Sequence, residues 1–125
     1  MKVKLLILTL MVSHTAMGGV KELEAAANKF CEKMKVCIKQ EMAKEMGDDI
    51  PQQMRDLVDQ MANQMCQQAL PEMMPDESMA DKQDFIEAGT QCLQDMQNIP
   101  CDQFETAEEP ASCKRAQALA EKYGQ

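Results

Sequence analysis

The fold depends on residues 21–46, which read KELEAAANKFCEKMKVCIKQEMAKEM. The apolar residues of this stretch recur three and four positions apart, which is the spacing of one face of an α-helix: Leu23, Ala26, Ala27, Phe30, Met34, Ile38 and Met42. The expected helix also carries Cys31 and Cys37, which lie about 60° to either side of Met34 at 100° per residue. They cannot bond to each other across the helix, so each must reach a different neighbour.

A second helix is expected directly after Gly47, a residue that favours the left-handed backbone found at helix ends. Asp49 and Gln52 have the spacing of a capping box, and Pro51 is acceptable in a first turn. The apolar stripe expected to face the core consists of Ile50, Met54, Leu57, Val58, Met61, Met65 and Ala69.

Two more helices follow a loop bracketed by Pro71 and Pro75. One is expected over residues 78–98, with Ser78 or Asp76 as its N-cap and Pro100 beyond its end. The other is expected over residues 110–124. Strand-forming residues are scarce and never alternate with polar ones, so we predict an all-α fold. The architecture is a small disulfide-stabilised helical bundle, three main helices running up-down-up plus a short C-terminal helix.

The first 18 residues have the pattern of a secretion signal. Lys2 and Lys4 precede an apolar run at residues 5–12, and Ala16-Met17-Gly18 places small residues where a signal peptidase cleaves. The run is too short to span a bilayer of ~30 Å. We therefore expect an exported protein, periplasmic if the source is bacterial and otherwise extracellular.

The remaining residues, 19–125, are expected to form one helical domain. The 13 basic residues include Lys2 and Lys4, so removing the leader leaves 11 bases against 21 acids and a net charge of −10. Such a charge repels nucleic acid and anionic lipid surfaces, and we expect neither as a partner. No second apolar segment is long enough to span a membrane.

All six cysteines lie after the leader, which predicts three disulfides. A turn near Asp48 would place Cys31 and Cys66 at nearly equal distances from it, so we predict Cys31–Cys66. A third helix returning alongside the first brings Cys92 within about one turn of Cys37, which favours Cys37–Cys92 and leaves Cys101–Cys113. The alternative, Cys37–Cys101 with Cys92–Cys113, requires the acidic connector to fold back over the bundle.

The residue types needed for common enzyme chemistry are missing. The only histidine, His14, lies in the leader, and neither Ser78 nor Ser112 sits in a nucleophile motif. The closest cysteines, Cys31 and Cys37, are too far apart for a thioredoxin-type redox pair. We predict no enzyme activity, no catalytic residues, no metal site and no cofactor.

Thirteen methionines raise one alternative, because thioether sulfur suits Cu(I). Met42 with Met46, and Met61 with Met65, are pairs four residues apart, and Met73 and Met74 fall in the expected loop. Met54, Met61 and Met65 nevertheless share a stripe with Leu57 and Val58, so we interpret them as core residues that fill irregular gaps.

These observations favour a non-catalytic interaction or binding module whose partner is a protein or a small apolar ligand. One alternative is a carrier of a small apolar ligand or of Cu(I). A weaker alternative is an enzyme that uses carboxylates only. An exposed apolar patch over a filled core would favour the interaction module. A cavity lined by methionine would favour the carrier, and two converging acids in a cleft would favour the enzyme.

Overall fold

The computed structural model describes residues 19–47 and 49–124. The expected leader and Asp48 lie outside these residues. The helices are α1 (Val20–Met46), α2 (Gln52–Met73), α3 (Gln83–Gln97), the short 3-10 helix η1 (Cys101–Gln103) and α4 (Ala111–Gly124). The described part of the chain contains no strand, and three disulfides join its helices and connector. The prediction of an all-α, disulfide-stabilised bundle is confirmed.

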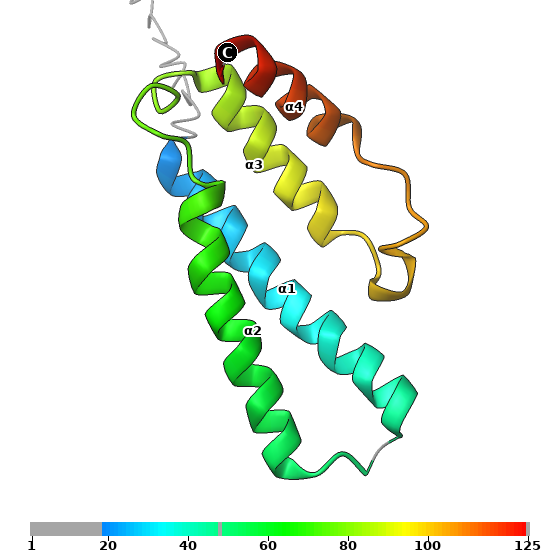
Figure 1. Ribbon diagram of the computed structural model, residues 1–125. Helices are drawn as coiled ribbons and strands as arrows, with labels where there is room; N and C mark the ends of the chain where they lie inside the picture. Colours follow the sequence, from blue (N-terminus) through cyan, green and yellow to red (C-terminus); the bar gives the residue numbers. More distant parts are fainter. Residues whose placement is uncertain (1–18, 48, 125) are drawn as a thin grey trace, which may run out of the picture.

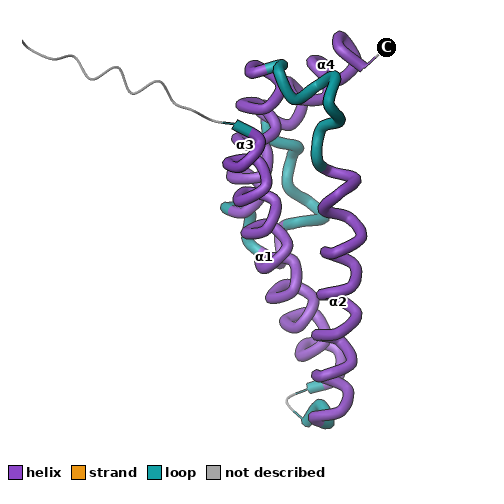
Figure 2. Tube along the Cα trace, turned by 90° about the vertical axis from the view of Figure 1, so that its left-hand side faces the viewer, coloured by secondary structure: helices purple, strands orange, loops and turns teal. Residues whose placement is uncertain are grey.

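The helices pack in the order α2, α1, α3, α4 (Figure 1). Helix α1 contacts α2 on one side and α3 on the other, whereas α4 packs on α3 alone. Helix α3 runs parallel to α1 and covers only its N-terminal part, so the α1–α2 hairpin extends beyond α3 and α4 (Figure 1). Figure 2 shows the same end of the hairpin from the side, again without a third layer.

The core is small and lies where α1 and α3 meet. Its buried residues are Leu23, Ala26, Ala27, Ile86 and Leu93, with Val20, Phe30, Leu70, Met74 and Phe85 packed against them. Among the described residues, Ile86 is the large side chain with the lowest exposure, 1%. Because so little apolar surface is buried, covalent links must contribute a large share of the stability.

The end of α1 matches the prediction from the sequence, whereas the start of α2 does not. Gly47 has φ +76° and ends α1, with its N–H donating to the Ala43 carbonyl at 3.0 Å. The expected capping box at Asp49 is wrong. Pro51 occupies the N-cap position instead, and its carbonyl oxygen accepts the N–H of Met54 at 3.0 Å.

Helix α2 runs through Pro71 rather than stopping before it. Pro71 removes one N–H donor near the C-terminus, but the helix recovers at the next turn, where the Met74 N–H donates to the Leu70 carbonyl at 3.2 Å. The expected loop position of two methionines is therefore corrected: Met73 ends α2, and Met74 is its C-cap and packs against the core.

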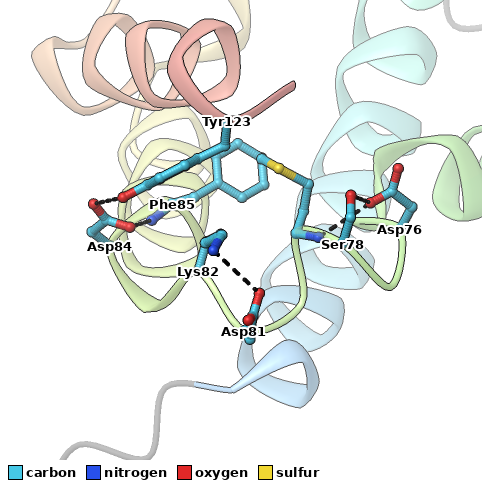
Figure 3. A network of polar contacts seen from close by, with 8 residues as sticks. Asp76, Ser78, Asp81, Lys82, Asp84, Phe85 and Tyr123 are labelled. Carbon is cyan, nitrogen blue, oxygen red and sulfur yellow. Dashed lines mark hydrogen bonds and ion pairs between the residues drawn. The ribbon is translucent and has the colours of Figure 1, made fainter. Parts of the chain in front are cut away.

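Helix α3 begins at Gln83, five residues later than expected. Asp76 caps a turn instead of the helix, because its Oδ1 accepts the Ser78 hydroxyl at 2.6 Å and the Met79 N–H at 3.2 Å (Figure 3). The buried side chain of Met79 anchors that turn. The polar residues predicted to start α3 therefore shape the crossover from α2.

The structure pairs Cys31 with Cys66, as predicted. The predicted Cys37–Cys92 and Cys101–Cys113 bonds are wrong, and the alternative pairing is present: Cys37–Cys101 and Cys92–Cys113, with Cα–Cα distances of 5.1 and 4.5 Å. The prediction assumed that the acidic connector does not fold back over the bundle. The chain instead turns back after α3, and η1 lies against α1.

A ring contact supports this return of the connector. Phe104, just after η1, lies with its ring centroid 6.4 Å from that of Phe30 on α1. Cys92 is thereby left on the side of α3 that faces α4, where the buried Cys113 meets it.

We expect reductant to lower the melting temperature by more than about 10 °C, since each disulfide contributes roughly 2–4 kcal/mol and 1 kcal/mol shifts a domain of this size by about 4–8 °C. Circular dichroism melts with and without a phosphine reductant measure the shift. An unchanged curve would show that the core alone stabilises the fold.

Candidate functional site

Four of the seven residues predicted to face the core from α2 are exposed instead, and these four are called the stripe below. Val58 and Ala69 of the predicted set do face α1, as expected. Met54, Leu57, Met61 and Met65 expose 36, 53, 55 and 62% of their surface. The residues that approach α1 are smaller and lie on a neighbouring face: Val58, Ala62, Cys66 and Ala69. Ala62 is the most buried of these, at 5% exposure.

The Cys31–Cys66 disulfide accounts for this rotation of α2. The bond points Cys66 at α1. At 100° per residue, Met65 then lies about 100° and Met61 about 140° away from that direction. Two overlapping apolar faces are present on α2, and the disulfide selects the one with small side chains.

An apolar groove of about 170 Å³ runs beside the exposed stripe, between α1 and α2. Its apolar lining residues are Phe30, Met34 and Ile38 on α1, and Ala62, Met65 and Ala69 on α2, and the Cys31–Cys66 pair and Lys35 complete its wall. We define the open face by six residues, four on the stripe and two from the groove: Met54, Leu57, Met61, Met65, Met34 and Ile38. Much of this face lies on the part of the hairpin that α3 does not cover (Figures 1 and 2).

The open face carries little charge. Helix α2 has no charged side chain between Gln60 and Pro71. The charged residues before that stretch engage partners away from the stripe. Arg55 donates to the Ile50 carbonyl at 3.0 Å, Asp56 accepts from Gln52 at 2.9 Å, and Asp59 pairs with Lys39 at 2.6 Å.

The other exposed side of α2 is polar. It forms a shallow depression lined by Asp56, Asp59, Gln60, Asn63, Gln64 and Gln67. Helix α2 therefore presents two distinct surfaces to solvent, one apolar and one polar, on the same rigid element.

The structure gives the methionine pairs different surroundings. Met61 and Met65 lie on the open face, whereas Met42 is half-buried in a cavity at the hairpin turn and Met46 is 49% exposed. All six cysteines are bonded. Within residues 19–47 and 49–124, no group of three or more His, Cys, Asp or Glu is placed to hold a metal ion.

The carboxylates with perturbed pKa values hold α3 to α4. The Tyr123 hydroxyl donates to Asp84 Oδ2 at 2.7 Å (Figure 3). This hydrogen bond lowers the pKa of Asp84, against the opposing effect of desolvation, and raises the pKa of Tyr123 above its usual value. At the other end of the pair of helices, the Ser112 hydroxyl donates to Asp95 Oδ2 at 2.6 Å and is the main reason that the pKa of Asp95 is lowered.

The connector before α4 carries three exposed glutamates, Glu105, Glu108 and Glu109. Glu109 accepts a hydrogen bond from Gln117. These carboxylates and those of α3 are accounted for by solvation or by helix packing.

None of the helices in the described residues is both long and apolar enough to cross a membrane. Comparison of the chain with protein-family models, with curated proteins and with solved structures gives no match. The case for a function therefore depends on the surfaces described above, of which the open face is the most distinctive.

We expect substitution on the stripe to have little effect on stability, because its side chains are half-exposed. In dilute protein, Met61→Gln should change the free energy of unfolding by less than about 0.5 kcal/mol. Ile86→Ala, in the core, should lower it by about 2–5 kcal/mol. Urea unfolding followed by circular dichroism measures both. Equal losses of unfolding free energy in the two variants would show that Met61 is part of the core.

The contact between Tyr123 and Asp84 predicts a pH window for α4 docking. The pKa of Asp84 is lowered, so its contribution to stability is present above the unfolded value near 4 and is lost as pH falls through the folded pKa. The pKa of Tyr123 is raised, so its contribution is lost as pH rises past about 10.

Tyr123 is the only tyrosine, and the chain has no tryptophan, so tyrosine fluorescence and absorbance report this contact alone. In Asp84→Asn, the tyrosine should titrate closer to its usual pKa than in the unmodified protein. An unchanged tyrosine titration in that variant would show that the carboxylate does not hold the hydroxyl.

Proposed function

We propose that the chain is a small non-catalytic interaction module that binds a protein partner through the open face. The observation that carries this proposal is the exposure of Met54, Leu57, Met61 and Met65 along one side of α2. Single exposed apolar residues are ordinary, but a contiguous stripe beside an apolar groove is typical of interaction sites. Methionine is favoured on such surfaces because its flexible side chain adapts to a partner.

The same proposal assigns no catalytic residue. The lowered pKa values of Asp84 and Asp95 come from hydrogen bonds that join α3 to α4 rather than from two acids converging in a cleft. With the only histidine at position 14, neither carboxylate has an imidazole partner within residues 19–125.

The setting of the interaction is an oxidising compartment, as three disulfides indicate. Export by a leader over residues 1–18 is part of the proposal. The destination would be the periplasm of a bacterium, or otherwise the extracellular space.

A carrier of a small apolar ligand is the second candidate, because the groove between α1 and α2 is lined by apolar residues with Lys35 as the one charged residue. Met34 and Met65 both line it, so Cu(I) remains within this alternative. A groove that is partly open to solvent encloses a small ligand poorly, whereas it suits an extended partner. This contrast favours the interaction module.

The test is a photo-crosslinking residue placed on the open face at Met61 in the full chain, expressed in its source organism or a close export-competent host. A matched control carries the same residue at Gln67, on the polar side of α2. We expect ultraviolet light to produce an adduct of protein mass at position 61 and not at position 67.

The carrier would be favoured over the interaction module by two results together. These are the absence of a protein adduct at position 61 and a retained apolar molecule or copper in native mass spectrometry. Equal adducts at both positions would show contact without a preferred surface. That result would contradict the proposal that the open face binds the partner.

A further inference from the structure

We infer that the partner that occupies the open face is a second copy of this chain, packed antiparallel along α2 about a two-fold axis. This inference rests on the proposed function and specifies its partner. It follows from the scarcity of charge on the face and from the spacing of its apolar residues, and the size of the face limits how strongly two copies can bind.

Charge is the first argument. Two copies with a net charge of −10 over residues 19–125 repel each other wherever their acidic surfaces meet. The stretch from Gln60 to Pro71 carries no charge at all, and its polar side chains are Gln and Asn. A foreign partner of so acidic a protein would be attracted by a charged rim. A neutral rim instead suits a partner with the same charge.

The spacing is the second argument. A two-fold interface requires a surface that is complementary to itself. The stripe on α2 is nearly symmetric about its middle, with Met54 and Met65 as its ends and Leu57 and Met61 as its inner pair. In an antiparallel pair of α2 helices, Met54 therefore faces Met65 of the other copy, and Leu57 faces its Met61.

The charged groups near this contact are already paired within the chain. Lys35 lines the groove, and its ammonium pairs with Glu32 at 2.8 Å. Arg55, Asp56 and Asp59 fall within the same length of helix, but each already engages a partner of its own chain. Met34 and Ile38, half-exposed in the adjacent groove, extend the apolar contact from α2 onto α1.

The size of the face limits the strength of the contact. The stripe from Met54 to Met65 is about 17 Å long, and the two helices of the hairpin together are about 20 Å wide. A face of these dimensions is well below the roughly 800 Å² per partner that a stable interface of standard size buries. The inference is therefore a reversible dimer that forms at high protein concentration, not a permanent one.

Sedimentation velocity on the purified, oxidised protein tests the inference over about 1 µM to about 1 mM. We expect the mass to rise from that of one chain to that of two. Met61→Glu places a carboxylate near the two-fold axis and should raise the dissociation constant at least tenfold. Gln67→Glu adds the same charge on the polar side of α2 and should leave it within twofold.

Circular dichroism and intact mass confirm that each variant is folded and fully oxidised. Met65→Glu, at the most exposed position of the stripe, replaces Met61→Glu if that variant unfolds. A single-chain mass at every concentration would overturn the dimer. Equal weakening of the dimer by Met61→Glu and Gln67→Glu would show that the open face is not the dimer interface.

The antiparallel arrangement has its own readout. A photo-crosslinker at Met54 should attach to the other copy near Met65, and a crosslinker at Met65 should attach near Met54. Attachment of Met54 to Met54 would overturn the antiparallel pairing. If crosslinks at position 61 in the source organism join only a different protein, the second copy is excluded while the interaction module stands.

Discussion

The Cys31–Cys66 disulfide is the constraint on which the surface of this molecule depends. The bond joins α1 to α2 and fixes the rotation of α2 about its own axis. With Cys66 turned inward, Ala62 packs at the helix interface at 5% exposure, while Met65, one residue before the cysteine, is 62% exposed. Hydrophobic burial alone would favour the opposite choice, because leucine and methionine bury more apolar area than alanine. A covalent link thus maintains an apolar surface that burial would otherwise remove.

The other two disulfides let the described residues hold four α-helices with a small core. Cys37–Cys101 fastens the connector to α1, and Cys92–Cys113 fastens α4 to α3. Between them, the hydrogen bonds from Ser112 to Asp95 and from Tyr123 to Asp84 set the position of α4 at two places along α3. Helices α3 and α4 are in this way anchored without help from the far end of the hairpin, which leaves that end available for contact.

Helix type, number and order follow from the sequence because Ala, Glu, Lys and Met at helical spacing leave no competing strand pattern. The Cys31–Cys66 bond also follows, since it needs only a hairpin of two long helices. The inward face of α2 could not be chosen in the same way. Leu57 and Val58 are neighbours of similar hydropathy, and periodicity fits a stripe through either. The predicted Cys31–Cys66 disulfide was enough to choose the inward face of α2. A helix turned to present Cys66 to α1 must also present Ala62 and Ala69.

The remaining errors come from local backbone behaviour. Pro71 is tolerated because only the last turn of α2 loses a donor, and Asp76 caps a turn where a helix start was expected. The Cys37–Cys101 bond depends on the chain turning back after α3. This tertiary event is accompanied by the tilted ring contact between Phe104 and Phe30, and no local pattern predicts it. The open face, the main candidate for function, was present in the sequence as a methionine stripe but was assigned to the core.

Methionine oxidation, mapped by mass spectrometry after brief exposure to peroxide, tests the central claim most directly. In dilute protein, Met61 and Met65 should oxidise at nearly the rate of free methionine, and the buried Met79 should oxidise far more slowly. In concentrated protein, oxidation of Met61 and Met65 should slow, while Met46, which is exposed but lies off the open face, should not change. If Met61 and Met65 oxidise as slowly as Met79 in dilute protein, the stripe belongs to the core and the account is wrong.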